Sequence, residues 1–305
     1  APSLPIRALG AVGRFAQVTR LLRRRPDAIL MFAAGGFSLL EKSMYSRMAG
    51  ALGVRSLLFV RAGDVMDRSR RSFWYRRLVR WLLAGPDRLL CQGDRWRRFF
   101  IDEMNYPSER CPVIMNWTAT PALLRLGDRR DYRRTAAPVR ILFVGWLSVG
   151  KGLFDLLEAF DRLVGTGGPQ AELHIAGAGK AEAGARAQVA ARGLGDRVVF
   201  HGWVGGEEKL ELFRQADLFV LPSYHEGMPN ALIEAMASGL PSVVTAVGCI
   251  PDMATDGKEV VMVPVGDPAA LEEALRSLTL SDCLRGQLGR AALARAIEEF
   301  TVEPA

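Results

Sequence analysis

Two glutamates, Glu226 and Glu234, stand in the part of the sequence whose residue types best suit chemistry, the segment 222–241 (PSYHEGMPNALIEAMASGLP). Seven residues separate them, and the second falls in an amphipathic helix that ends at Gly239–Pro241. A short polar loop precedes this helix, and a helix start points free N–H groups at anions. Carboxylates accept hydrogen bonds from hydroxyl groups. The segment therefore predicts one bound molecule whose phosphate lies at the helix start and whose hydroxyls meet the two acids.

Three other loops rich in small residues accompany this segment. Residues 144–152 (VGWLSVGKG) carry Lys151 as a point charge, although their spacing matches neither a P-loop nor the dinucleotide-binding fingerprint. A structural turn explains this loop equally well when it is taken alone. Residues 175–179 (IAGAG) and 201–204 (HGWV) end the next two expected strands. Backbone groups of the latter could meet a base. Together the loops favour a ligand site at one edge of a sheet.

The elements that must position these loops alternate regularly after residue 138. Strands are predicted at 140–144, 171–176, 197–201, 217–221, 242–245 and 260–264. Helical patterns lie between them, including 153–164, 206–215 and 268–278. Near-continuous apolar strands separated by helices indicate a parallel sheet covered on both faces. Residues 139–305 are therefore expected to form a Rossmann-like α/β domain.

Residues 1–138 are expected to form a separate α/β domain. Strands are predicted at 27–32, 56–60 and 88–91, with helices at 37–52 and 72–83. Three strands are too few for a complete Rossmann-like domain, so this domain is expected to be truncated or to contain strands that the pattern does not reveal. The charged segment 128–138, which ends in proline, predicts a linker between the two domains.

The composition, 49% hydrophobic over 305 residues, is typical of a globular protein with two domains. No segment suits a membrane span, and the first residues do not have the pattern of a signal peptide. The four cysteines show no paired spacing, so neither a disulfide framework nor a zinc site is indicated. These features favour a reducing, cytoplasmic setting.

The charge is unevenly distributed. Residues 1–136 carry 26 Lys and Arg against 11 Asp and Glu, a balance of +15, whereas the remaining residues carry −8. Such a field favours an anionic partner, which membrane lipid, nucleic acid or a phosphorylated substrate would satisfy. Solvated arginine faces without a partner explain the excess equally well.

Residues 72–85 (SFWYRRLVRWLLAG) predict an amphipathic helix with a basic border. One face carries Phe73, Trp74, Leu78, Trp81 and Leu82, and off it lie Arg76, Arg77 and Arg80. Such a helix can lie at an anionic membrane interface. Equally, its apolar face can belong to the domain core, with the arginines as a solvated rim.

A family resemblance covers more than a third of the chain. Residues 140–265 resemble the donor-binding domain of retaining glycosyltransferases of the GT-B fold, family 4, which transfer a sugar from a nucleotide sugar to an acceptor. The resemblance is carried by Glu226 and Glu234 within EGMPNALIEAMASGLP, by Gly145–Gly152, by Gly177–Gly179 and by the segment 247–257. It implies two Rossmann-like domains that face a central cleft.

The resemblance also implies a role for each matching residue. Glu226 would contact hydroxyls of the donor sugar near the reacting carbon, and Glu234 would bind the ribose. Lys151 and the helix start would stabilise the diphosphate as its charge develops, so neither a metal nor a cofactor besides the nucleotide-sugar co-substrate is expected. The implied donor-binding set is Gly145, Trp146, Gly177, Trp203, Val204, Gly227, Met228, Pro229, Asn230, Ala231, Leu232 and Glu234.

Two positions depart from the family's pattern. Trp146 stands where the family usually has an arginine on the diphosphate, so phosphate binding would rely on Lys151 or on an arginine from elsewhere. Arg61 stands where the family often has a histidine; it cannot act as a base at neutral pH, but it suits a diphosphate or an acidic acceptor. Asp64 is then the nearest candidate to accept the acceptor's proton, although a turn or capping role explains it more readily.

The sequence is thus expected to encode a hexosyltransferase-type glycosyltransferase that acts with retention on a glycan or lipid-linked acceptor, in surface polysaccharide or glycolipid synthesis. It would work in the cytoplasm, with a peripheral contact to the anionic inner face of the plasma membrane. Two alternatives remain: another GT-B enzyme that hydrolyses or epimerises nucleotide sugars, and a nucleic-acid-binding protein that uses the arginine-rich first domain. No aromatic–basic strand signature or recognition helix supports the latter.

Overall fold

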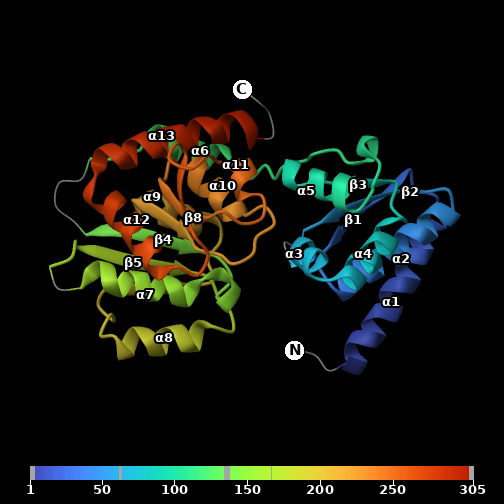
Figure 1. The fold of residues 1–305 in the computed structure, drawn as a ribbon, viewed down its shortest axis with the longest axis horizontal. Coiled ribbons are helices and arrows are strands. Elements are labelled where there is room, and N and C mark those ends of the chain that lie inside the picture. Colours follow the sequence, from blue (N-terminus) through green and yellow to red (C-terminus); the bar gives the residue numbers. More distant parts are fainter. Residues whose placement is uncertain (1–3, 62–63, 134–137, 166, 302–305) are drawn as a thin grey trace. The chain divides into compact units, whose positions relative to one another are not determined.

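The computed structural model describes residues 4–61, 64–133, 138–165 and 167–301. It divides into two compact units, Ala1–Ile114 (unit 1) and Met115–Ala305 (unit 2), which Figure 1 shows with their helices and strands. Each unit contains a parallel sheet and helices, so the predicted α/β class is confirmed. Among the described helices, none combines the length and the apolar character needed to cross a membrane.

Unit 1 is built on a parallel sheet of three described strands in the order β1-β2-β3. These are β1 (Ala28–Ala33), β2 (Arg55–Val60) and β3 (Arg88–Leu90), and each matches a predicted strand. Its helices are α1 (Leu4–Leu22), α2 (Phe37–Ala51), α3 (Asp64–Arg71), α4 (Phe73–Leu83) and α5 (Asp94–Arg98), with short turns at Phe99–Glu103 and Ser108–Arg110. Helix α1 was not predicted. The helix predicted at 72–83 is α4, and Ser72 caps it by accepting a hydrogen bond from the N–H of Tyr75.

The described residues of unit 2 form six parallel strands in the order β6-β5-β4-β7-β8-β9. The strands are β4 (Val139–Val144), β5 (Ala171–Ala176), β6 (Val198–Gly202), β7 (Leu218–Leu221), β8 (Ser242–Thr245) and β9 (Val260–Val263). All six predicted strands are thus confirmed. Every side chain of the inner strands β7 and β8 is buried, because helices cover both faces of the sheet.

The helices of unit 2 complete a Rossmann-like arrangement. They are α6 (Pro121–Asp128), α7 (Leu153–Val164), α8 (Glu182–Ala191), α9 (Gly206–Gln215), α10 (Asn230–Ala237), α11 (Ile250–Met253), α12 (Pro268–Leu280) and α13 (Asp282–Glu299), with a short turn at Val149–Lys151. In Figure 1, α7 and α8 lie on one side of the sheet and α6, α10 and α13 on the other. The strand order is that of a dinucleotide-binding fold, in which the first strand stands at the centre.

The boundary between the units lies at residue 114, earlier than the linker predicted at 128–138. Helix α6 packs against α9, α10 and α13. Just after it, Arg130 donates hydrogen bonds of 2.6 to 2.7 Å to the carbonyl oxygens of Phe213, Ala216 and Ser238. These contacts make residues 115–133 part of unit 2, which hydrophobic patterning could not reveal. Residues 134–137 of the predicted linker lie outside the described ranges.

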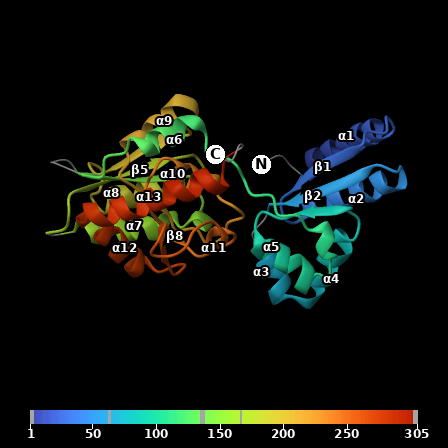
Figure 2. The same cartoon turned by 90° about the horizontal axis from the view of Figure 1, so that it is seen from above.

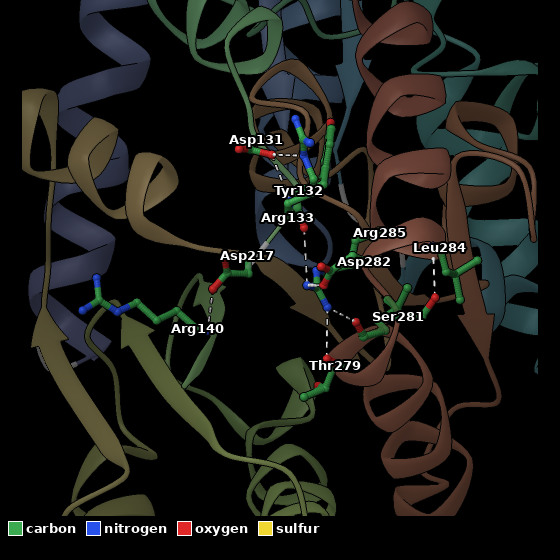
Figure 3. Close-up of polar contacts among 11 residues, drawn as sticks. Asp131, Tyr132, Arg133, Arg140, Asp217, Thr279, Ser281, Asp282, Leu284 and Arg285 are labelled. Atoms are coloured by element: carbon green, nitrogen blue, oxygen red, sulfur yellow. Dashed lines mark hydrogen bonds and ion pairs between the residues drawn. The ribbon is translucent and has the colours of Figure 1, made fainter. Parts of the chain in front are cut away.

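Two groups of polar contacts, one between strands and one between the last two helices, lie at the same end of unit 2 (Figure 3). The backbone N–H of Arg140 in β4 donates to Asp217, just before β7, at 2.7 Å. Arg285 in α13 is 2% exposed and donates to the carbonyl oxygens of Leu278 and Thr279 at 2.6 and 3.0 Å. These contacts fix the amino ends of β4 and β7 and the turn between α12 and α13. The opposite ends of the strands carry the loops of interest.

Candidate functional site

Four loops of unit 2 follow the carboxyl ends of adjacent parallel strands. Strand β4 is paired with β5 on one side and with β7 on the other, so the chain order reverses at β4. In open α/β sheets a ligand lies in the crevice at such a switch point. The loops begin at Gly145, Gly177, Trp203 and Pro222, after β4, β5, β6 and β7 respectively.

Backbone contacts join the first three loops. The N–H of Gly145 donates to the carbonyl of Ala176 at 3.0 Å, and the N–H of Gly177 donates to that of Gly202 at 2.6 Å. Gly177 has a φ of 147°, and a Cβ there would lie 1.8 Å from the carbonyl oxygen of Gly145. Only glycine satisfies both conditions. The small residues seen in the sequence thus allow the loops to approach one another.

These loops line a pocket of about 220 Å³. Its lining includes five predicted donor-binding residues, Gly145, Trp146, Gly177, Trp203 and Val204. The indoles of Trp146 and Trp203 are 72% and 78% exposed. Two exposed indoles beside a cavity suit a flat aromatic ligand, because rings of this kind stack on heterocycles.

Glu226 lies in the loop after β7 and is 7% exposed. Its Oε1 lies 2.6 Å from Nζ of Lys151 and accepts a hydrogen bond from Oγ of Ser223 at 2.7 Å. The structure thus brings together Glu226 and Lys151, two predicted catalytic residues from different loops. A buried carboxylate without a cation is costly, so Lys151 stabilises Glu226 in place.

Close backbone packing fixes this ion pair. Gly152, beside Lys151, has a φ of 68°, and a Cβ there would lie 2.0 Å from the carbonyl oxygen of Pro222. Gly248 has a φ of 58°, and its Cβ would lie 2.2 Å from the carbonyl oxygen of Glu226. The loop after β7 is therefore held between the loops that follow β4 and β8. Such preorganised charge is the kind that stabilises a transition state.

Glu234 lies on α10 and pairs with Lys209 on α9. Its two carboxylate oxygens are 2.7 and 2.6 Å from Nζ of Lys209. Burial raises the pKa of Glu234 above the ordinary value, and Lys209 opposes that rise. Lys209 also lines the pocket beside Trp203. Glu234 is therefore linked to the pocket by its ion pair with Lys209, which lines it.

The start of α10 offers backbone donors. The helix begins at Asn230 with no side-chain cap. Within the described part of the chain, the N–H groups of Asn230 and Ala231 make no hydrogen bond, whereas that of Leu232 donates to the carbonyl of Pro229 at 3.1 Å. The helix start that was predicted to bind the diphosphate thus has two N–H groups available to an anion.

The residues just before α10 are held by Asn116. Its Nδ2 donates to the carbonyl of Met228 at 2.9 Å and to Oδ1 of Asn230 at 2.6 Å. Met228 is 4% exposed, so it offers a ligand only its backbone. Gly227 accepts a hydrogen bond from the N–H of Cys249 at 2.8 Å. The predicted donor-binding segment Gly227–Asn230 therefore has a fixed backbone.

The predicted acceptor-side residues lie in unit 1. Arg61 is exposed, and its guanidinium carbon lies 5.9 and 6.0 Å from the ring centres of Phe32 and Phe59. Asp64 begins α3, and its side chain lies outside the described part of the structure. The roles expected for both residues stay predictions.

A larger hollow, of about 620 Å³, lies between α6 and α9. Its lining is rich in charge and includes Arg125, Arg129, Arg130, Arg214, Asp131, Glu207 and Asp217. Asp217 precedes β7, so the hollow lies at the amino ends of the strands, away from the four loops. Its lining contains no predicted site residue. The predicted donor-binding residues line the smaller pocket instead.

Sequence reasoning missed Lys209 and Asn116. A signal for Lys209 exists, because it is the single lysine of the predicted helix 206–215 and a buried acid needs a nearby cation. No signal exists for Asn116, which lies 112 residues before Met228 and was assigned to the first domain. Contacts at such separation do not show in local patterns.

Residues 138–281 match the sequence model of the family described as glycosyl transferases group 1. The matched segment runs from β4 to the end of α12. It contains all four loops, both glutamates and both lysines. The family match therefore falls on the part of the chain that builds the candidate site.

Two curated relatives extend this likeness. A D-inositol 3-phosphate glycosyltransferase of Arthrobacter sp. (strain FB24) is 31% identical over 246 residues, which are 78% of this chain and 57% of that protein. The amylovoran biosynthesis glycosyltransferase AmsK of Erwinia amylovora is 35% identical over 169 residues, which are 53% of this chain and 41% of that protein. The chain thus spans less than two thirds of the length of either relative.

Among solved structures, Anabaena Alr3699/HepE in complex with UDP and glucose aligns with a TM-score of 0.72, at 18% identity, over 93% of this chain and 77% of that one. Identity this low bears on the fold alone. Neither alternative, a hydrolase or epimerase or a nucleic-acid-binding protein, is favoured by these comparisons. The chain has the α/β GT-B fold, and its residues 138–281 match the glycosyl transferases group 1 family.

Proposed function

We propose that this protein is a glycosyltransferase that moves a hexosyl group from a nucleotide-diphosphate sugar to a glycan or lipid-linked acceptor. The observation that carries the proposal is the placement of two glutamate–lysine pairs, Glu226 with Lys151 and Glu234 with Lys209, at the sheet edge that bears the pocket. The family match and the activities named for both relatives support it.

Each part of the donor has a matching group in the proposed mode of binding. The base lies in the pocket against Trp146 and Trp203, and Glu234 accepts hydrogen bonds from the ribose hydroxyls. The diphosphate meets the free N–H groups at the start of α10 and the ammonium of Lys151. Glu226 then accepts hydrogen bonds from hydroxyls of the transferred sugar.

In the proposed reaction, the bond between the anomeric carbon and the phosphate oxygen breaks, and its electron pair leaves with the nucleoside diphosphate. The acceptor oxygen bonds to the anomeric carbon and loses its proton, with Asp64 as the proposed base. One preorganised donor to the departing charge contributes on the order of 3 kcal/mol. On the resemblance in sequence, we also propose retention of anomeric configuration and membership of family 4.

Trp146 brings no charge to the diphosphate, so Lys151 and the helix start carry that task in the proposal. Lys151 carries a positive charge and the start of α10 a partial positive charge, and both adjoin the loop after β7. We expect them to replace a metal ion. Turnover unaffected by a chelator would agree with this, and turnover restored only by Mg²⁺ or Mn²⁺ would contradict it.

UDP-sugars are the first donors to test, because HepE was solved with UDP and glucose. The name of AmsK supports a place in surface polysaccharide or glycolipid synthesis.

The chain is incubated with UDP-glucose, UDP-N-acetylglucosamine or GDP-mannose, with and without a lipid extract, and the products are followed by NMR. Diphosphate release that requires the extract supports transfer, and NMR of the new bond tests retention. Release of free sugar alone would indicate a hydrolase, and an altered nucleotide sugar an epimerase.

A further inference from the structure

Helix α4 presents two apolar faces. One packs into unit 1, where Val79, Leu82 and Leu83 are at most 3% exposed. Leu82, which the sequence analysis grouped with the aromatic residues, therefore belongs to the buried face. Because this face already anchors the helix, the core does not need the other one.

The second face is exposed to solvent. Phe73, Trp74, Leu78 and Trp81 are 57%, 77%, 48% and 55% exposed. At 3.6 residues per turn these four side chains fall within an arc of about 140°. Soluble proteins rarely expose several large apolar side chains side by side unless the patch binds something. This outer face, defined by the four residues, decides against the interpretation of the predicted face as domain core.

Arginines border the outer face of α4, and Arg77 falls within its arc. Residues 68–81 contain six arginines and no acidic residue. Arg77 lies over the ring of Phe73 at 5.8 Å, and Arg47 of α2 lies over that of Trp81 at 4.4 Å. Figure 2 shows α3, whose last turn is basic, beside α4. Unit 1 as a whole carries 21 Lys and Arg against 9 Asp and Glu, a balance of +12.

We propose that the outer face of α4 docks unit 1 on the surface of an anionic lipid bilayer. The helix is 11 residues long, too short to span a membrane, and it would lie in the plane of the interface. Tryptophan side chains favour the boundary between headgroups and acyl chains. Arginine side chains reach from that depth to lipid phosphates. Aromatic and basic groups mixed on one helix face match this surface better than either type alone would.

The same face suits other partners less well. Arg70 already pairs with Glu103 at 2.6 Å, but a protein groove that took the apolar residues would also need acidic groups for Arg76 and Arg77. A nucleic acid would take the arginines, whereas the described sheet of unit 1 exposes one aromatic ring, that of Phe32, and stacking of successive bases needs several. Docking does not depend on the proposed glycosyl transfer, because α4 belongs to unit 1 and the donor pocket to unit 2. If both hold, docking favours the lipid-linked class of acceptor.

The test is co-sedimentation of the full chain with vesicles of phosphatidylcholine alone or mixed with phosphatidylglycerol. We expect binding only to the anionic vesicles, weakened by salt. The double variant Trp74→Ser/Trp81→Ser should lose at least tenfold in affinity. Its control is Trp117→Ser in unit 2, because Trp117 is as exposed as Trp81, at 55%. Unchanged circular dichroism and thermal midpoints would show that the exposed substitutions leave the fold intact.

A second pair of variants separates charge from apolar insertion. Arg76→Gln/Arg77→Gln should weaken binding about 25-fold, about fivefold for each arginine, and should reduce the salt dependence. Its control is Arg162→Gln/Arg186→Gln, two arginines on helices of unit 2 whose side chains are 48% and 52% exposed.

Three results would overturn the proposal. One is equal binding to neutral and anionic vesicles, and another is binding that survives the loss of both tryptophans. The third is evidence for another partner. Binding to a labelled RNA or DNA oligonucleotide that is stronger than binding to vesicles would be such evidence. So would a lack of vesicle binding together with self-association that the tryptophan variant abolishes.

Discussion

Nζ of Lys151 lies 2.6 Å from Oε1 of Glu226, across two loops that glycine packing holds together. Glu234, the other acid of the spaced pair, has a lysine of its own in Lys209. The two acids are not equivalent. Glu226 lies in a loop held by the close packing of Gly152 and Gly248, whereas Glu234 lies on a helix, where burial raises the pKa of its carboxyl group. Substitutions of the two lysines are therefore expected to have different effects.

Replacement of Lys151 should affect the chemical step. Lys151→Met removes a positive charge from the proposed leaving group and leaves Glu226 buried without its cation, so we expect turnover to fall by roughly 10² to 10³. Steady-state release of nucleoside diphosphate measures this. The matched control is Lys258→Met, because Lys258 also pairs with a buried glutamate, Glu259, at 3.1 Å, but outside the site. Equal losses in both variants would contradict the assignment.

Replacement of Lys209 should change the pH dependence of nucleotide binding. Burial raises the pKa of Glu234 and Lys209 lowers it, so Lys209→Met leaves burial alone and the pKa rises further. In the proposed mode of binding, the ionised carboxylate accepts hydrogen bonds from ribose, so we expect affinity to be lost as the pH falls through this pKa. The pH of half-maximal affinity should be higher in the variant.

Calorimetric titrations with UDP at a series of pH values measure that shift. Glu234→Gln serves as the control, because an amide in place of the acid should abolish this pH step. A midpoint that stays in place or moves down in Lys209→Met would refute the role given to the pair.

Much of this arrangement follows from local sequence. The six strands of unit 2 were predicted from apolar runs, because parallel strands buried on both faces read continuously. Glycines such as Gly177 marked the loops that meet, and the spaced pair Glu226 and Glu234 marked the acids. Of their two lysine partners, Lys151 was predicted. Lys209 was not predicted, because it reaches Glu234 from another helix.

The role of Trp146 can be tested by separating the base from the phosphates. Trp146→Ala should weaken binding of both uridine and UDP by about 1 to 3 kcal/mol, the contribution of one stacked base. Trp146→Arg should weaken uridine binding in the same way but favour UDP relative to uridine, with a steeper salt dependence. Parallel titrations with both ligands decide the matter. Unchanged affinity for uridine in both variants would remove Trp146 from the base pocket.

Glycine packing at the pocket predicts a large effect on stability. Gly177→Ala places a Cβ 1.8 Å from the carbonyl oxygen of Gly145 at a φ of 147°, so we expect the free energy of unfolding to fall by at least about 2 kcal/mol. Gly150→Ala is the matched control, because nothing lies within 4 Å of its Cβ position, and it should change stability by less than about 0.5 kcal/mol. Urea unfolding compares them; indistinguishable midpoints would mean that the loops are not packed this way.

Other features could not be predicted from local patterns. The charged segment 128–138 predicted a linker, yet Arg130 in it caps three carbonyl groups of unit 2. The helix 72–83 was recognised, but its two faces could not be assigned, because Leu82 and Trp81 are equally apolar and only packing decides which is buried. Long-range contacts thus determine both the domain boundary and the surface.

The most direct test of the central claim is calorimetric titration of the chain with UDP, GDP and ADP, alongside Lys151→Ala and Glu234→Ala. The account predicts that one of the three diphosphates binds with one-to-one stoichiometry and that each substitution weakens its binding at least tenfold. Absence of binding by all three, or binding that neither substitution changes, would contradict a nucleotide-sugar site at the carboxyl ends of β4 to β7.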